Sequence, residues 1–143
     1  MTGERTGHFW DAVEGRAPMP AATITLGWSL IHADTERGEI EVSFEASEEF
    51  LNPAGSVQGG FLTAMLDDTM GPALAATLGP GLYGTTIDLK VSFLRPAKPG
   101  RLVGRGRVVH RGSTIAFLAG ELLDDAGRVV AVGSATTRIV RTG

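Results

Sequence analysis

The sequence contains no cysteine and only three histidines in 143 residues. Without a thiol, the chain has no disulfides, no thiolate nucleophile and no zinc–thiolate site. The histidines, His8, His32 and His110, are far apart in the chain and far from the motif described below. A serine nucleophile activated by histidine would need one of them to converge on a distant serine. We therefore rank such a mechanism low.

A strong charge of one sign and a long apolar run are also missing. The formal net charge is −3, so the chain offers no broad basic field and we expect no nucleic-acid partner. The most apolar stretch, residues 60–78, is too short and too interrupted by polar residues to span a membrane. Residues 1–16 are polar and mixed, unlike a secretory signal. We expect no membrane association and a cytoplasmic location.

The length and composition predict one globular domain with a short N-terminal attachment. Hydrophobic residues make up 43% of the chain and charged residues 20%, which is typical of a folded protein with a sizeable core. We expect a helical or flanking segment over residues 1–20 and the domain proper over residues 21–143. Within the flanking segment, residues 6–15 are predicted to form a short helix, with Thr6 as its cap and His8 on the surface.

The most informative stretch is Asn52 to Leu78. Its beginning, residues 52–60, is rich in turn-forming Asn-Pro, Gly and Ser. From Gly60 onward, apolar side chains occur in nearly every direction around a helical period, which predicts one long buried helix. We expect Gly79-Pro80-Gly81 to end this helix.

Two carboxylates in the middle of this helix do not fit a plain core helix. Asp67 and Asp68 have no basic residue three or four positions away, and a buried carboxylate without a partner is costly. They must be paired from elsewhere, hydrated or functional. For Asp68 a structural role is also open, because Pro72 has no N–H and leaves the Asp68 carbonyl without its helical donor.

The start of the helix carries Gln58-Gly59-Gly60. The first N–H groups of a helix have no internal acceptor, and glycine lets a ligand oxygen approach them closely. Unpaired N–H donors followed by a carboxylate two turns later suit acyl transfer. The alternative is ordinary structure, since a Gly-Gly pair before a helix is commonly only a turn and a mid-helix aspartate commonly faces solvent.

At this point the sequence resembles a known family, the hotdog-fold acyl-CoA thioesterases of the PaaI-like group. The family pattern is Asn, a short gap containing Gly, His-Gly-Gly, six variable residues and Asp. Asn52, Gly59, Gly60 and Asp67 match it in type and spacing, whereas Gln58 stands where the family more often has His. The resemblance implies hydrolysis of an acyl-CoA thioester to a carboxylic acid and free CoA, with no metal and no cofactor.

The resemblance also implies roles for individual residues. The Gly59 N–H would polarise the thioester carbonyl, and Gln58 and Asn52 would help to shape that pocket. Asp67, from the opposite subunit, would act as general base on water or as direct nucleophile. Thr86 occupies the position where relatives hold a hydroxyl that orients the attacking water. From the residue type alone, ordinary strand propensity would explain Thr86.

Further residues are predicted to bind the substrate. Coenzyme A carries phosphates, so basic side chains are expected near the mouth of the cleft, and a threonine next to Thr86 would replace it if the strand register slips by one. The substrate-binding candidates are Gly60, Asp68, Thr85, Arg95, Lys98 and Arg111.

The rest of the chain alternates as β-strands do. Strands are predicted over residues 23–32, 39–46, 84–95, 101–111, 113–124 and 128–140. In the third of these, alternation places Leu89 and Val91 on one face and Thr86 and Asp88 on the other. Two strands, a long apolar helix and four more strands predict an α+β hotdog fold, a curved antiparallel six-stranded sheet wrapped around the helix.

The exposed edges of such a sheet, together with the resemblance, imply a homodimer or a dimer of two such dimers. Two other functions stay open at this stage. A non-catalytic acyl-CoA-binding hotdog protein would account for Gln58 in place of His, although retention of Asp67 favours an enzyme. A hotdog hydratase or dehydratase ranks lower, because it needs a histidine beside the acid. Aryl, short-chain and medium-chain acyl groups are all compatible with the sequence.

Overall fold

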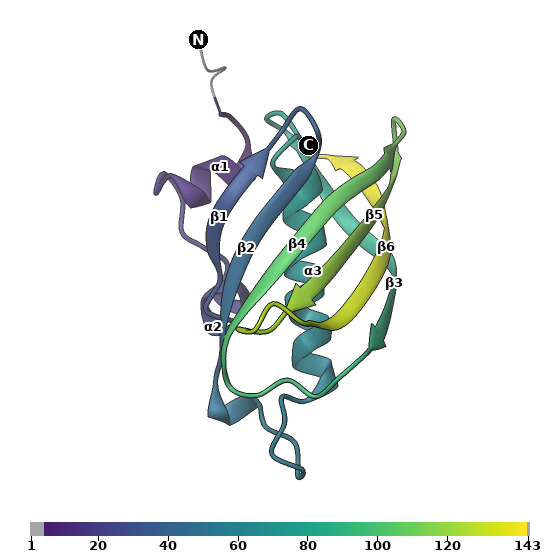
Figure 1. The fold of residues 1–143 in the computed structure, drawn as a ribbon. Coiled ribbons are helices and arrows are strands. Elements are labelled where there is room, and N and C mark those ends of the chain that lie inside the picture. The colour runs from purple at the N-terminus through teal and green to yellow at the C-terminus, as the bar shows by residue number, and fades with distance from the viewer. Residues whose placement is uncertain (1–4, 143) are drawn as a thin grey trace.

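The computed structural model describes residues 5–142 and shows one curved sheet around one long helix (Figure 1). Residues 1–4, where the expected flanking segment begins, and Gly143 lie outside the described residues. The strands are β1 Ser29–Asp34, β2 Glu39–Ala46, β3 Leu82–Phe93, β4 Gly100–Arg111, β5 Ile115–Leu123 and β6 Val129–Arg141. The helices are α1 His8–Val13, α2 Ala21–Thr25, the short 3-10 helix η1 Glu48–Phe50 and the long α3 Gly59–Ala75.

The six strands form a single antiparallel sheet in the order β1-β2-β4-β5-β6-β3. The chain leaves β2 through α3 and returns as β3 at the far edge, so α3 lies across the concave side of the sheet (Figure 1). This arrangement confirms the predicted hotdog fold. It also makes β3, a strand of 12 residues, an edge that pairs only with β6.

Glycines in the sheet allow α3 to approach it closely. Gly106, Gly120 and Gly133 lie in register on β4, β5 and β6. A Cβ at Gly106 would lie 2.7 Å from the Thr69 carbonyl oxygen, and one at Gly120 would lie 2.8 Å from Met70 Cγ. A glycine inside a strand often marks the close approach of another backbone. Here the row of glycines fixes the turn of α3 that contains residues 66–70.

The long helix is less buried than its composition predicts. Its residues toward the sheet are buried: Leu62, Met65, Leu66, Thr69, Met70, Ala73 and Leu74. On the opposite side Gly60 and Asp67 are exposed in the single chain. The helix also ends at Ala75, so the prediction that Gly79-Pro80-Gly81 ends it is wrong by one turn.

The first predicted strand, residues 23–32, is wrong in its first half. Ala21–Thr25 form α2, which begins directly after Pro20 and in which Thr25 Oγ1 donates to the Ala21 carbonyl at 3.1 Å. Gly27, at φ 67°, turns the chain, and β1 begins at Ser29. The β-branched residues of this segment favoured a strand. Instead the N–H groups of Ile24 and Leu26 donate to the Pro20 and Ala22 carbonyls, at 3.1 Å each, and these bonds close a short helix.

The N-terminal helix is present but is capped differently from the prediction. Its N-cap is Gly7, not Thr6, and Gly7 adopts φ 113° with no side-chain cap. A Cβ at Gly7 would lie 2.8 Å from the Leu78 carbonyl oxygen, so glycine is needed for this close approach. Trp10 is buried, and its Nε1 donates to the Ala76 carbonyl at 3.0 Å. The division of the chain at residue 20 stays a prediction.

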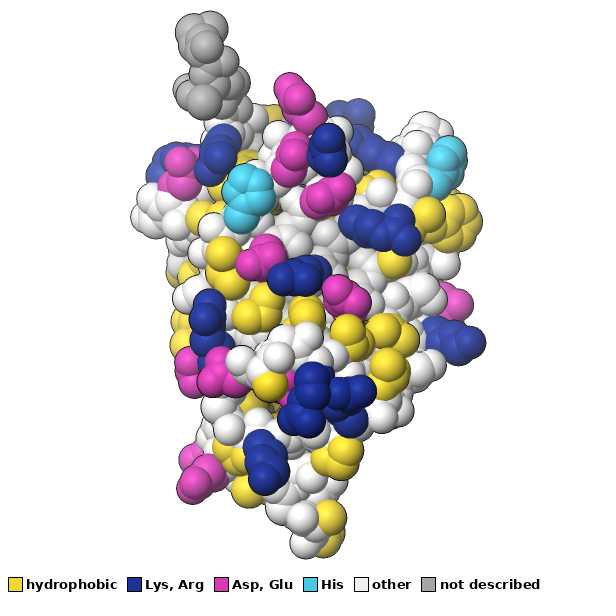
Figure 2. All heavy atoms as spheres, in the orientation of Figure 1, with side chains coloured by type: hydrophobic (Ala, Val, Ile, Leu, Met, Phe, Trp, Pro, Cys, Tyr) yellow, Lys and Arg dark blue, Asp and Glu magenta, His cyan; other side chains and the backbone are white. Residues whose placement is uncertain are grey.

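The surface carries charges of both signs. Figure 2, in the orientation of Figure 1, shows acidic, basic and apolar side chains intermixed over the visible face, without a broad field of one sign. Within residues 5–142, no helix combines the length and the hydropathy that a membrane span requires.

Candidate active site

Two of the predicted catalytic residues meet on the side of α3 that faces away from the sheet's centre. Thr86 Oγ1, on β3, donates a hydrogen bond to Asp67 Oδ1, on α3, at 3.1 Å. Both residues are exposed in the single chain. The result is a carboxylate and a hydroxyl at an open surface, where water and a substrate have access to both.

A β-bulge in β3 brings Thr86 to this position. The register with β6 shifts between Thr86 and Asp88, so Ile87 is an extra residue in the strand. An extra residue reverses the alternation of side chains beyond it. As a result Thr86 bonds to α3 while Leu89 also packs toward the core, so the prediction that they lie on opposite faces is wrong. Thr85, next to Thr86 in the regular part of the strand, points away from Asp67.

The start of α3 offers unpaired donors. Gln58 is the N-cap, its exposed side chain caps nothing, and its carbonyl accepts from the Phe61 N–H at 2.9 Å. Among the described residues, the Gly59 and Gly60 N–H groups donate no hydrogen bond. The Phe93 ring lies against Gly59, because a Cβ there would be 3.0 Å from the ring. Sequence reasoning did not single out Phe93, which alternation alone presents as one more apolar strand residue.

The donors and the carboxylate are far apart within one chain. Gly59 and Asp67 are eight residues apart on the same helix, which corresponds to about 12 Å along its axis. Reacting groups must lie within about 3–3.5 Å of the atom they act on. One chain therefore cannot bring both its Gly59 N–H and its Asp67 to the same carbonyl group.

Asn52 is engaged by its own loop. Its Oδ1 accepts the N–H groups of Ala54, at 3.0 Å, and Ser56, at 3.1 Å. A side-chain oxygen that accepts from the backbone two residues later is a common way of closing a turn. The Asn52 oxygen thus stabilises the loop that leads into α3, and its amide NH₂ is the part of the side chain that could reach a substrate.

Asp68 faces a different side of α3 from Asp67, toward the N-terminal helices. Trp28 Nε1 donates to the Asp68 carbonyl at 2.9 Å, which supplies the donor that Pro72 lacks. Burial raises the pKa of the Asp68 carboxyl to about 6, a hydrogen bond with the Thr23 hydroxyl acts in the opposite direction, and the charge of Asp67 adds to the increase. The sequence indicated an unpaired carbonyl but gave no sign that Trp28 would serve it.

The basic candidates fall at opposite ends of α3. Arg95 and Lys98 are exposed on the loop between β3 and β4, and this loop is tied to the helix start because the Val57 N–H donates to the Ala97 carbonyl at 2.8 Å. Arg111 lies beyond the other end of the helix, where its Nη1 contacts Thr77 Oγ1 at 3.4 Å. In one chain, only Arg95 and Lys98 lie near the Gly59 end.

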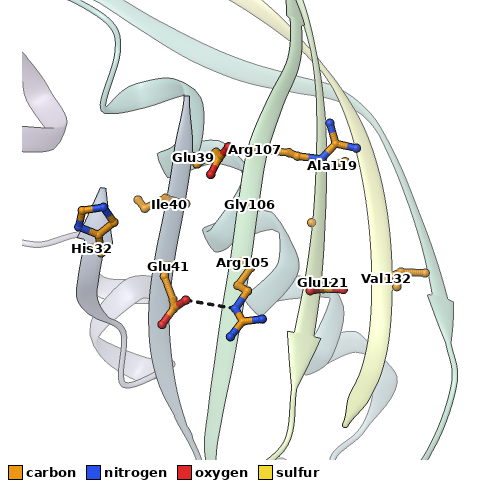
Figure 3. Close-up of a pocket in the computed structure, with 11 residues that line it drawn as sticks. His32, Glu39, Ile40, Glu41, Arg105, Gly106, Arg107, Ala119, Glu121 and Val132 are labelled. Atoms are coloured by element: carbon orange, nitrogen blue, oxygen red, sulfur yellow. Dashed lines mark hydrogen bonds and ion pairs between the residues drawn. The ribbon is translucent and has the colours of Figure 1, made fainter. Parts of the chain in front are cut away.

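A pocket on the sheet lies away from the Asp67–Thr86 pair and is built differently. It has a volume of about 470 Å³ and is lined by charged side chains of β2, β4 and β5, among them Glu41 and Arg105, which form an ion pair at 3.1 Å (Figure 3). His32 lines this pocket, and His110 stacks on Phe117. None of the residues that line it belongs to α3 or β3. It therefore does not contain the Asp67–Thr86 pair.

His8 is the one histidine on the side of Asp68, at the edge of the pocket that Asp68 lines. Within residues 5–142, no group of three or more acidic or histidine side chains is arranged to hold a metal ion.

Comparison with known proteins identifies the family. Residues 54–131 match the model of the thioesterase superfamily, and this range covers both α3 and β3. The chain therefore belongs to the thioesterase superfamily and is a thioester hydrolase.

Solved structures and curated relatives agree with this assignment. A phenylacetic acid degradation-related protein from Ralstonia eutropha JMP134 is 43% identical, with a TM-score of 0.90 over 92% of this chain and 99% of that chain. The PaaI protein of E. coli, from the phenylacetic acid degradation operon, shares the fold at 24% identity, with a TM-score of 0.80 and 94% of each chain covered. Acyl-coenzyme A thioesterase 13 of Homo sapiens is 29% identical over 104 residues, which are 71% of this chain and 74% of that protein.

The raised pKa of Asp68 predicts a pH-dependent cost of folding. The folded chain binds the Asp68 proton more tightly than the unfolded chain, whose pKa is near 3.8. The contribution of this group to the free energy of unfolding is therefore greatest below about pH 4. It decreases by roughly 3 kcal/mol in total as the pH rises to about 6, and it is constant above that. We expect Asp68→Asn to raise the free energy of unfolding at pH 7.5 and to leave it unchanged at pH 3.8 and below. Urea unfolding across this pH range measures the difference.

Asp125→Asn, at the exposed tip of the β5–β6 turn, serves as the control for that experiment. A stabilisation by Asp68→Asn that is equal at all pH values would contradict the assigned cause.

Proposed function

We propose that this thioester hydrolase acts on acyl-CoA, releasing a carboxylic acid and free CoA, with Asp67 as its catalytic carboxylate. The observation that carries the proposal is the hydrogen bond between Thr86 Oγ1 and Asp67 Oδ1 on the open side of α3. The substrate class rests on the resemblance to acyl-CoA thioesterases and on the relative that carries this name.

The proposed reaction uses two kinds of group, the hydroxyl–carboxylate pair of Thr86 and Asp67 and the free N–H of Gly59. A water molecule held between the Thr86 hydroxyl and Asp67 attacks the thioester carbon, and Asp67 accepts its proton. In the alternative, Asp67 itself attacks and the resulting anhydride is hydrolysed by water. In both, the negative charge that develops on the carbonyl oxygen is stabilised by the Gly59 N–H at the positive end of α3, and the C–S bond then breaks to release CoA.

The site is completed by a second copy of the chain. The separation of about 12 Å between Gly59 and Asp67 along α3 requires that they come from different chains at any one carbonyl. The edge strand β3 is suited to such pairing, since it is long and carries the exposed apolar side chains of Tyr83 and Ile87. We propose a homodimer joined along β3, alone or as half of a dimer of dimers.

Coenzyme A binding is assigned to the Gly59 end of the site. Arg95 and Lys98 extend from the loop that is bonded to the start of α3, so their charges lie on the side from which the thioester must approach Gly59. Gly60 has open space around its Cα, with no atom within 4 Å of the position that a Cβ would occupy, and leaves room for the chain that follows the thioester.

The main test is a thiol-release assay of the purified protein against aryl-, short-chain and medium-chain acyl-CoAs. We expect turnover on at least one of them and a loss of about 10³-fold or more in kcat for Asp67→Asn, because the general base or nucleophile is removed. Gln58→Ala should be less damaging, since the donor at this end is the backbone. The control is Asp125→Asn. Tight binding of an acyl-CoA without any turnover would instead favour a non-catalytic acyl-CoA-binding protein.

Substitutions of two adjacent threonines distinguish a role of Thr86 in the reaction from a structural role in β3. We expect Thr86→Val to lower kcat by about 10- to 100-fold, which corresponds to the loss of a hydrogen bond to a charged group. Thr85→Val makes the same chemical change one residue earlier, on the opposite face of β3, and should leave kcat within about twofold of wild type. Equal losses in the two variants would remove Thr86 from the mechanism.

Complementation tests whether the Gly59 N–H and the Asp67 carboxylate of one active site come from different chains. Gly59→Pro removes the N–H at the first helical position, where the helix backbone tolerates proline, and its ring also displaces the adjacent Phe93 ring; Asp67→Asn removes the carboxylate. Each variant alone should be inactive, whereas equal amounts refolded together should recover about a quarter of wild-type activity, because half of the dimers are mixed and each holds one intact site. No recovery from two variants that both fold and dimerise would place Gly59 and Asp67 in separate functions.

A further inference from the structure

A pocket of about 190 Å³ lies between the N-terminal helices and the middle of α3. Its apolar walls are formed by Phe9, Ala12, Val13, Met19, Trp28 and Pro72. The exposed His8 stands at its edge, and Asp68 is the carboxyl group that lines it. The pocket is thus a half-open apolar recess with a single acidic group, and Thr23 also lines it.

One oxygen of that carboxyl has no partner. Asp68 Oδ2 is buried and has no hydrogen-bond donor among the described residues. The Trp28 indole cannot serve it, because its N–H is already bonded to the Asp68 main-chain carbonyl at 2.9 Å. A buried carboxylate oxygen without a donor is costly, and native proteins satisfy nearly all such groups.

We propose that this pocket binds a small apolar group that carries one hydrogen-bond donor and presents it to Asp68 Oδ2. The size fits a single ring, since an apolar cavity of about 150 Å³ accepts benzene in a protein core. The donor can be a hydroxyl or an ammonium group, because either satisfies a carboxylate oxygen, and the aromatic walls also attract a cation.

Such a group has two sources, a free small molecule or the far end of the acyl chain of the substrate. The second source is open because there is free space beside α3 one turn beyond the two aspartates. Gly71 lies one turn beyond both Asp67 and Asp68, and nothing lies within 4 Å of the position that its Cβ would occupy. An acyl group at Asp67 could pass over Gly71 toward the pocket. Only this second source rests on the proposed function.

Binding is tested directly with phenol, benzylamine and toluene as probes at pH 7.5. The chain has two tryptophans, and only Trp28 lines the pocket, so the Trp28 indole N–H signal in a ¹H–¹⁵N spectrum reports occupancy. We expect phenol and benzylamine to shift this signal and to leave that of Trp10 unchanged. In Asp68→Leu the ratio of the Kd for toluene to that for phenol should fall by about tenfold or more, since the donor loses its acceptor.

Asp125→Leu, on the exposed turn, is the matched control and should keep the wild-type ratio. Ala12→Phe, which fills the pocket from α1, should abolish the shifts by all three probes and keeps the test decisive if Asp68→Leu does not fold. The proposal is overturned if no probe shifts the Trp28 signal, or if the toluene-to-phenol ratio is the same in Asp68→Leu as in wild type.

Hydrolysis kinetics show which of the two groups occupies the pocket. If it is the far end of the acyl chain, phenol should compete with an acyl-CoA that the enzyme hydrolyses, and Gly71→Leu should raise KM while leaving the Kd of phenol unchanged. For a free molecule, phenol should bind without competing. If no acyl-CoA is hydrolysed, the proposed function fails, and the binding measurements still decide whether the pocket takes a donor-bearing apolar group.

Discussion

The contact between the middle of α3 and a row of glycines in the sheet sets the geometry of the molecule. Gly106, Gly120 and Gly133 are in register on three neighbouring strands, and their missing side chains let Thr69 and Met70 reach the backbone of the sheet. Once these residues face inward, helical periodicity determines the direction of their neighbours. The turn that is pressed against the sheet therefore also directs Asp67 toward β3 and Asp68 toward the N-terminal helices.

The N-terminal segment depends on the same helix. Its two tryptophans donate to main-chain carbonyls in or just after α3, Trp28 to Asp68 and Trp10 to Ala76. Each bond fixes an aromatic ring against the helix and satisfies a carbonyl near the helix's second half. The two bonds hold the N-terminal segment against α3, and this segment forms one wall of the apolar pocket that Asp68 lines.

The sequence predicted those features that depend on local pattern. The alternation of β2, the position of α3 and the pairing of Gly59 with Asp67 in one motif all follow from periodicity, turn residues and a family resemblance. The features it did not predict depend on contacts between distant residues. Nothing in the sequence indicates that Trp28 replaces the donor missing at Pro72, or that the threonines of residues 21–25 serve a helix. The placement of Thr86 beside Asp67 was expected from the resemblance alone, because simple alternation put it on the wrong face.

The bulge at Ile87 makes chain length, rather than side-chain identity, the determinant of where the Thr86 hydroxyl points. On one side of the bulge β3 directs Thr86 to α3, and on the other it directs Leu89 to the core, so both needs are met by a single additional residue. Substitutions of Ile87 leave that count unchanged. A regular strand of the same length would place Thr86 and Leu89 on opposite faces, whereas deletion of Ile87 would remove the bulge and leave both on the same face. In the divergence of such chains, this part of the edge strand should accept changes of residue type, and changes of length where the extra residue and its bulge are lost together.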